Sequence, residues 1–404
     1  MKREPSRREK ALAEDFAKGL QLHRKGQLGR AELYYRKVLT TEPQHFDALH
    51  LLGVVEGQNG NFDAALELLQ RAVALRPEHP AALNNFGNTL GSLKRHEEAL
   101  AAFDRSLAQR PDDAKALRNR GTTLRALKRS SEALESFERA LALQPGFADA
   151  IVSRAETLQD LGRLPEAIDA FRDALEHGKD GETIRYALAA LGDEPLPSTA
   201  PPSYVTGLFD GYSDSFDAHL VGTLNYRTPA LLVELLKRFT SGPADIVDLG
   251  CGTGLCAPLL RPLAKRLVGV DLSGGMLAKA REAGHYDTLE RVEVAAYLDG
   301  QPQAFDIAVA ADVFVYIGDL AAVFAAVRKA LRPGGLFAFS VEAISDADYV
   351  LRPTRRFAHS AAYLERLAAK NGLGVEAIEH QAIREDRGGN VDGLLVLLRH
   401  TPAQ

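Results

Sequence analysis

The chain of 404 residues is poor in cysteine and contains no tryptophan. Its two cysteines, Cys251 and Cys256, stand outside any CxxC or Cys/His cluster, which argues against a disulfide framework or a metal site. No run of about 18 uncharged apolar residues occurs, so nothing points to a membrane span. The start, MKREPSRREK, is charged where a signal peptide has its apolar core. We therefore expect a cytoplasmic protein with no membrane partner and no metal.

An excess of positive charge is also missing. The chain has 49 basic and 54 acidic residues, a net charge of −5, and neither half is basic overall. Because nucleic-acid binding depends mainly on cationic side chains that neutralise phosphates, we expect no nucleic-acid partner. The length suggests two or three domains. With 46% hydrophobic residues, the composition argues against disorder.

Several kinds of residue recur every 34 positions in the first half of the chain. The recurring prolines are Pro43, Pro77, Pro111 and Pro145. The recurring small residues are Ala31, Ala65, Ala99, Ala133 and Ala167, together with Gly19, Gly53, Gly87, Gly121 and, in the fifth place, Ala155. A bulky residue follows each alanine of the first set by four positions: Tyr35, Leu69, Phe103, Phe137 and Phe171. Small residues allow helices to approach closely, and a proline stops each second helix.

This period and these columns resemble the tetratricopeptide repeat. The resemblance implies an all-α solenoid over residues 12–191, made of five helix pairs and a capping helix, after a basic tail at residues 1–11. The first helices of such repeats line a concave groove, and polar side chains on them are candidates for contacting a peptide. These candidates are Asn84, Asn85, Asn88, Arg118, Asn119 and Arg125. The alternative is that they are ordinary solvated helix residues.

The pattern changes after a proline-rich linker at residues 192–203. From residue 204 to residue 404, short apolar runs alternate with helical stretches: DIVDLG, LVGVDLS, VEVAAYL, FDIAVAADV and LRPGGLFAFSVE. This alternation predicts an α/β domain with a doubly wound, mostly parallel sheet. The last two runs, VEAIEHQAIRE and VDGLLVLLR, predict a closing antiparallel hairpin.

Two acidic residues and a glycine-rich loop follow the first two predicted strands. Gly250, Gly252 and Gly254 allow a tight turn and close approach of a ligand to the backbone. Asp248, just before this loop, would repel a pyrophosphate but attract the ammonium group of an amino acid. Asp271, at the end of the second strand, is placed to accept hydrogen bonds from ribose hydroxyls. A nucleoside joined to an amino acid fits both carboxylates.

In order and spacing, the motifs between about residues 245 and 342 resemble the class I S-adenosylmethionine-dependent methyltransferases, whose domain is Rossmann-like. The resemblance implies that S-adenosylmethionine is the cofactor. The residues that it places around this cofactor are Asp248, Gly250, Gly252, Gly254, Asp271, Leu272, Met276, Glu293, Val294, Ala311 and Asp312. Glu293 and Val294 would lie at the polar edge of adenine, and Ala311 and Asp312 near the sulfonium.

An aromatic segment precedes the sheet, and its resemblance to lids of related methyltransferases implies a cover over the cofactor. Tyr204, Phe209, Tyr212 and Phe216 are the lid candidates. Tyr212 is the first choice, because an aromatic face attracts a cation. For Phe209 and Phe216, packing in the core is the alternative.

The acceptor pocket is expected between the fifth strand and the hairpin. His359 is a candidate base, because an imidazole titrates near neutral pH, although it could instead only cap a helix. Asp312 and Tyr316 could orient the nucleophile. Arg352, Arg356 and Tyr204 could contact the acceptor, although the arginines could instead only form a solvated edge.

Three functions remain open. The first is a methyltransferase whose repeats recruit a peptide or protein, and the second is a small-molecule methyltransferase whose solenoid serves assembly or regulation. The third is a scaffold that binds the cofactor without catalysis. The sequence does not indicate the acceptor atom or the oligomeric state.

Overall fold

The computed structural model describes residues 6–178, 181–210, 226–386 and 389–401. The chain divides into two compact units, residues 1–179 and residues 180–404, and each is described by itself. In the described part of the chain, no helix has both the length and the apolar character needed to cross a membrane.

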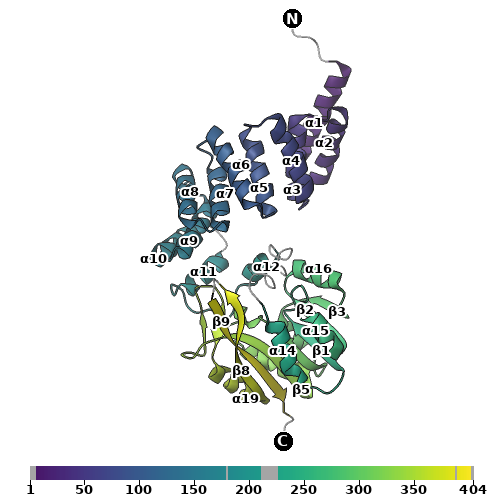
Figure 1. The fold of residues 1–404 in the computed structure, drawn as a ribbon, viewed down its shortest axis with the longest axis vertical. Coiled ribbons are helices and arrows are strands. Elements are labelled where there is room, and N and C mark those ends of the chain that lie inside the picture. Colours follow the sequence, from purple (N-terminus) through teal and green to yellow (C-terminus); the bar gives the residue numbers. More distant parts are fainter. Residues whose placement is uncertain (1–5, 179–180, 211–225, 387–388, 402–404) are drawn as a thin grey trace. The chain divides into compact units, whose positions relative to one another are not determined.

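The first unit is a row of five helix pairs, coloured purple to blue in Figure 1. Its helices are α1 (Arg7–Arg24), α2 (Leu28–Thr41), α3 (Phe46–Gln58), α4 (Phe62–Leu75), α5 (Pro80–Ser92), α6 (His96–Gln109), α7 (Ala114–Ala126), α8 (Ser130–Leu143), α9 (Ala148–Asp160) and α10 (Leu164–Glu176). The predicted helical solenoid is confirmed.

The small and bulky residues of the repeat meet inside each helix pair. A Cβ atom added at Gly121 would lie 2.7 Å from the ring of Phe137, closer than carbon atoms can approach. The same conflict recurs between Gly19 and Tyr35, Gly53 and Leu69, and Gly87 and Phe103. Each glycine therefore provides the space that the bulky residue of the second helix fills.

The second unit begins with α11 (Gly181–Ala190), α12 (Pro202–Asp210) and α14 (Thr228–Lys237). Its strands are β1 (Ala244–Leu249), β2 (Ala264–Asp271), β3 (Thr288–Arg291), β4 (Phe305–Ala310), β5 (Leu331–Ala343), β6 (Tyr349–Leu351), β7 (Phe357–His359), β8 (Leu373–Asp386) and β9 (Gly389–His400). Between them lie α15 (Ala257–Leu260), α16 (Gly274–Ala283), α17 (Val294–Asp299), α18 (Ala321–Ala330), α19 (Ala361–Lys370) and the short 3₁₀ helices η1 (Arg261–Leu263) and η2 (Phe314–Tyr316).

The described strands form one mostly parallel sheet in the order β3-β2-β1-β4-β5-β7-β6. β9 pairs antiparallel with β5 and with β8, which confirms the predicted hairpin. Helices α17, α18 and α19 pack in one buried cluster of the sheet, and α14 and α15 pack in another. The predicted doubly wound α/β domain is confirmed, and the parallel pairing of β1 with β2 and with β4 makes the carboxyl ends of these three strands adjacent.

One predicted strand is wrong. The run VEVAAYL becomes α17, and the third strand, β3, lies just before it. The Glu293 side chain accepts a hydrogen bond from the Ala296 N–H at 2.8 Å and so caps the helix. A local cap therefore prevails over the strand preference of valine and tyrosine.

Helix α11, expected to cap the solenoid, belongs to the second unit. The buried Tyr186 of α11 packs against Phe357 of β7, with 6.3 Å between ring centroids. Its hydroxyl donates a hydrogen bond to the Arg355 carbonyl at 2.9 Å. These contacts make α11 part of the α/β core, although it follows the repeats directly in sequence.

Replacing Tyr186 by phenylalanine should lower the stability of the second unit by about 1 to 2 kcal/mol, because the Arg355 carbonyl loses its donor. Urea unfolding of the full chain and amide hydrogen exchange in β7 measure the effect. Arg185→Ala, at an exposed position of the same helix, is the control and should change neither. Unchanged exchange in β7 in the Tyr186 variant would contradict the role given to α11.

Candidate functional site

A glycine loop lies at the carboxyl end of β1. Gly250, Gly252 and Gly254 have φ angles of +64°, +56° and +94°, a region that favours glycine. A Cβ atom at Gly250 would lie 2.5 Å from a methyl group of Val313. Gly250 therefore has room for no side chain, and the loop lies directly against the residue that follows Asp312.

Asp248 lies beneath this loop and is 1% exposed. The Tyr286 hydroxyl donates a hydrogen bond to its Oδ2 at 2.6 Å. Burial raises the pKa of Asp248 to about 7, although the bond from Tyr286 acts in the opposite direction. The carboxyl is thus ready to ionise when a cation approaches. Tyr286 was not among the predicted site residues, because it lies on a connection without a recognisable motif.

Asp271 connects the glycine loop to the turn before α16. Its Oδ2 accepts from the Gly252 N–H and its Oδ1 from the Ser273 N–H, both at 2.8 Å. Burial raises the pKa of Asp271, and these backbone donors partly oppose that shift. Leu272 continues the same turn. Met276, on α16, is buried, so the fold accounts for it as a core residue.

Two residues expected at the adenine edge are used by the fold. The carboxylate of Glu293 caps α17, as described above, and the side chain of Val294 is buried in the core of the sheet. Glu293 and Val294 therefore remain candidates for contacting adenine only through their backbone atoms, which follow β3.

A chain of charged side chains begins at Asp312, the second residue after β4. Asp312 has a φ of +61°, and its N–H donates to the Ser340 hydroxyl at 2.9 Å. Nη1 of Arg384, on β8, lies 3.0 and 2.9 Å from the two carboxylate oxygens of Asp312. The other guanidinium nitrogen, Nη2, bonds Glu342 on β5. Ala311 lies between β4 and this group.

Arg352 and Arg356 join the same charged group. Arg352 donates to Oε2 of Glu342 at 2.7 Å, and Arg356 lies 4.0 Å from Oε1 of the same carboxylate. Arg384 and Glu342 were missed by the sequence reasoning, since they are distant in sequence and belong to no motif. The strand pairing of β5 with β9, and of β9 with β8, brings them together.

The structure assigns His359 to the interior. The side chain is fully buried, and Nε2 donates to the Gly318 carbonyl at 3.0 Å. Burial lowers the pKa of His359 to about 4. A buried imidazole that is neutral and bonded to the backbone has no access to an acceptor, so this geometry favours packing over the predicted base. His359 also does not cap a helix, which was the alternative, because it is the last residue of β7 and Ser360 caps α19.

Tyr316 lies on η2, near the expected acceptor side. The ring of Phe209 stands edge-on to that of Tyr316, with 5.5 Å between centroids. Burial raises the pKa of the Tyr316 hydroxyl, while the Arg356 guanidinium lowers it. Tyr226 was not predicted as a site residue, and burial together with the Asp312 and Asp248 carboxylates raises its pKa. Tyr226 therefore lies among the same acidic groups.

Helix α12 carries the described part of the aromatic segment. Tyr204 packs against Tyr186, with centroids 5.1 Å apart, and so contributes to the core near α11. Asp210, the last residue of α12, accepts hydrogen bonds from the Ser273 hydroxyl at 2.5 Å and from the Gly275 N–H at 3.2 Å. These bonds hold α12 at the turn that contains Asp271. Tyr212 and Phe216 lie outside the described residues.

In the repeat unit, the predicted groove residues bond one another across successive repeats. Asn85 donates to Nε2 of His50 at 2.8 Å, and Asn119 donates to Oδ1 of Asn84 at 3.2 Å. Arg118 donates to Oδ1 of Asn119 at 2.9 Å. The side chains thus form a polar ladder over α3, α5 and α7. No periodic column included His50, so the sequence reasoning missed it.

Asn88 and Arg125 lie further along the first helices. Arg125 pairs with Glu156 at 2.5 Å and with Asp160 at 2.7 Å, both on α9. The backbone carbonyl of Asn88 accepts from the Ser92 hydroxyl. The structure therefore uses Arg125 as a link between repeats four and five.

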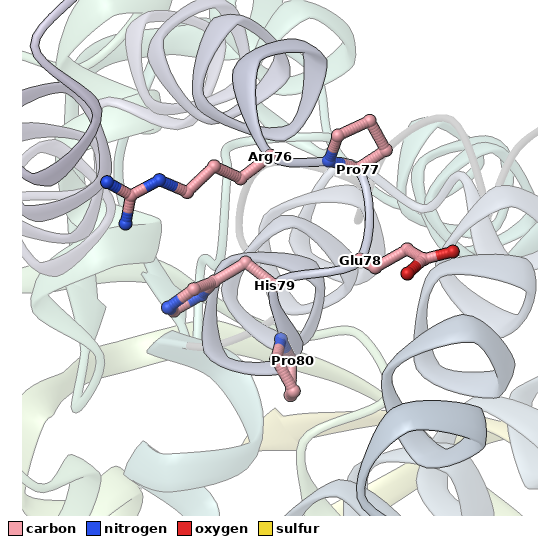
Figure 2. Close-up of a pocket in the computed structure, with 5 residues that line it drawn as sticks. All are labelled: Arg76, Pro77, Glu78, His79 and Pro80. Carbon is pink, nitrogen blue, oxygen red and sulfur yellow. The ribbon is translucent and has the colours of Figure 1, made fainter.

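An open pocket also lies at a turn of the repeat unit, where residues 76–80 line it (Figure 2). The Arg76 guanidinium stacks over the ring of Phe46, 4.1 Å from its centroid. Nδ1 of His79 accepts from the Ala82 N–H at 3.3 Å, so this histidine caps α5. The fold itself accounts for both side chains, and we assign no ligand to the pocket.

Two family models match the chain. A tetratricopeptide-repeat model matches four overlapping segments between residues 16 and 183, and a methyltransferase-domain model matches residues 247–337. The second match covers the glycine loop, Asp271 and Asp312.

Two relatives of this chain are named as methyltransferases. A ubiquinone biosynthesis O-methyltransferase of Methylococcus capsulatus is 31% identical over 152 residues, which cover 33% of this chain and 64% of that protein. A malonyl-[acyl-carrier protein] O-methyltransferase of Serratia marcescens is 30% identical over 174 residues, which cover 41% of this chain and 65% of that protein. The chain thus spans less than two thirds of the length of these relatives.

Among solved structures, MamA is similar to the chain at 26% identity and a TM-score of 0.37, covering 39% of this chain and 93% of MamA. The family matches coincide with the two units found in the structure. The chain therefore combines a domain of tetratricopeptide repeats with a methyltransferase domain.

Proposed function

We propose that the protein is an S-adenosylmethionine-dependent methyltransferase whose repeat groove recruits a peptide or protein acceptor. The observation that carries the enzymatic part is the pair of carboxylates, buried Asp248 and half-buried Asp271, on either side of a loop whose glycines have positive φ angles. When bound, the cofactor supplies a methyl group on a positively charged sulfur atom.

The residues present fit this cofactor. Asp248 is buried, which raises the pKa of its carboxyl, and an ammonium group such as that of the methionine portion would offset this cost of burial. Asp271 would hold the ribose, and its bonds to the Gly252 and Ser273 amides keep the carboxylate in place. The backbone of the glycine loop would lie against the methionine portion. Leu272 and the described aromatic residues of α12 would limit access of water.

The acceptor would bind beside Asp312 and Tyr316. Methyl transfer requires that the acceptor atom is aligned with the methyl group and that water is excluded. An acceptor that carries a proton also needs a base. Asp312 is the better candidate to receive that proton, because its side chain is partly exposed and its neighbour Val313 contacts the glycine loop, whereas His359 is fully buried. Arg352 and Arg356 would orient an anionic part of the acceptor.

The polar ladder supports the proposed peptide recruitment. Each asparagine amide has two N–H donors and an oxygen with two lone pairs, so one bond within the ladder leaves capacity for a peptide backbone. The ladder also restrains the side chains, which reduces the entropy lost on binding. A peptide in extended form could therefore pair with Asn85 and Asn119 without sequence selectivity.

Replacing Asn85 and Asn119 together by alanine should weaken peptide binding about ten-fold, since each lost amide contact costs about 0.5 to 1.5 kcal/mol. A peptide array followed by fluorescence anisotropy on the full chain measures this. Asn59→Ala, at an exposed position after α3, is the matched control. Equal affinity of wild type and double variant would exclude the groove as the binding site.

A small-molecule acceptor is the second candidate, favoured by the names of the two relatives. The repeats would then serve assembly or regulation. The two candidates differ in one result: with labelled cofactor, the double asparagine variant should lose methylation of a protein acceptor but retain that of a small oxygen nucleophile such as catechol.

A further inference from the structure

Four side chains of alternating charge connect the end of β4 to the loop before β7. They are Asp312, Arg384, Glu342 and Arg352, in that order of contact. Arg384 and Glu342, in the middle, are 2% and 3% exposed at the side chain, and Asp312 is 16% exposed. Arg356 also lies 4.0 Å from Glu342, so two carboxylates and three guanidinium groups are gathered here.

Such burial is costly unless each charge has a partner. Arg384 has two carboxylate partners. One guanidinium nitrogen contacts the two oxygens of Asp312, and a second nitrogen contacts Glu342. Arg384 lies on β8 of the β8–β9 hairpin, where the pairing register shifts between Ala382 and Arg384. The last hairpin of the chain thus supplies the charge that balances Asp312.

Asp312 is joined directly to the residue that contacts the glycine loop. The next residue, Val313, touches Gly250, and the Asp312 backbone adopts a positive φ that is rare for aspartate. The Asp312 N–H donates a hydrogen bond to the Ser340 hydroxyl. The carboxylate is therefore placed by three elements, β4, β5 and β8.

We propose that Arg384 is a positioning residue that neutralises Asp312 beside the reactive sulfur, an inference that rests on the proposed function. Methyl transfer removes the positive charge from sulfur. An unbalanced carboxylate there would stabilise the sulfonium reactant more than the neutral product and would thus oppose the reaction. With Arg384 in place, Asp312 can contact the acceptor without forming a strong ion pair with the donor.

The ratio of two affinities tests this without any acceptor. Calorimetry on the full chain gives the dissociation constants of S-adenosylmethionine and of S-adenosylhomocysteine, which lacks the charge on sulfur. In Arg384→Met the free carboxylate should shift the preference toward S-adenosylmethionine by roughly five-fold or more. In the double variant D312N/R384M the preference should equal that of D312N alone, because Arg384 acts only through Asp312.

The control is Arg399→Met, which removes an arginine of the same hairpin that pairs with Glu376 at the surface. It should leave the ratio unchanged. If Arg384 only packs the hairpin, both affinities fall together in R384M and the ratio stays constant, which overturns the proposal. If R384M does not fold, Arg384→Gln, which keeps N–H donors without the charge, replaces it with the same two outcomes. A difference in ratio between D312N and D312N/R384M also overturns the proposal. Wild-type protein that binds neither ligand would instead reject the proposed function itself.

Discussion

Replacing Asp271 by alanine should weaken the binding of S-adenosylmethionine by at least about 100-fold. Hydrogen bonds to a charged group contribute about 1.5 to 3 kcal/mol each, and two ribose hydroxyls would lose their acceptor. The variant also releases the Gly252 and Ser273 amides, so the loop loses its preformed geometry. Calorimetric titration of the full chain measures the affinity.

Asp299→Ala serves as the matched control, because Asp299 is an exposed aspartate of the same domain that pairs with Lys329. It should bind the cofactor like the wild type. Asp271→Asn, which keeps one acceptor oxygen, should fall between the two. A near-normal affinity in the alanine variant, with unchanged unfolding, would show that the cofactor does not bind at the end of β2.

The affinity for S-adenosylmethionine should rise with pH between about 5 and 7. The pKa of Asp248 in the free protein is about 7, so below that value the carboxyl is protonated and a bound ammonium group must displace the proton. Each pH unit below 7 then costs up to about ten-fold in affinity, and pH 5 up to about 100-fold. The amino group of the ligand stays protonated over this range, since α-amino groups titrate at about 7.7 to 8.0.

Asp248→Asn isolates this effect, because an amide cannot titrate. Its affinity should be lower than that of the wild type at pH 7 and nearly independent of pH down to 5. Calorimetry in buffers of different ionisation enthalpy should also detect proton release by the wild type on binding. A wild-type affinity that is flat from pH 5 to pH 7 would exclude direct pairing of Asp248 with the ammonium group.

Most of the fold could be predicted from local patterns in the sequence. In the repeats, a glycine on one helix and a bulky residue on the next, such as Gly121 and Phe137, satisfy a steric requirement within 16 residues, so the period can be read directly. The strand at DIVDLG and its loop follow the same logic: a short apolar run is buried, and glycines occupy positions of positive φ. The hairpin was also predictable, since its two strands are adjacent in sequence.

Three predictions depended on more than local pattern. The run VEVAAYL was expected as a strand and forms α17, because Glu293 caps a helix there. His359 was expected near the acceptor, but the bond to Gly318 and complete burial place it in the core. Asn85 and Asn119 were predicted to contact a peptide, which stays a prediction, but their bonds to side chains of neighbouring repeats could not be predicted from the period.

The sequence by itself determined the two kinds of domain and the cofactor-like loop, because both rest on residues close together in the chain. Only the tertiary structure decided which charges share the site. Arg384 meets Asp312 and Glu342 across separations of 72 and 42 residues through the pairing of β4, β5, β9 and β8, and α11 joins the core of the second unit through Tyr186. Contacts of this kind leave no periodic trace, since the partners are selected by position in the folded sheet and not by spacing along the chain.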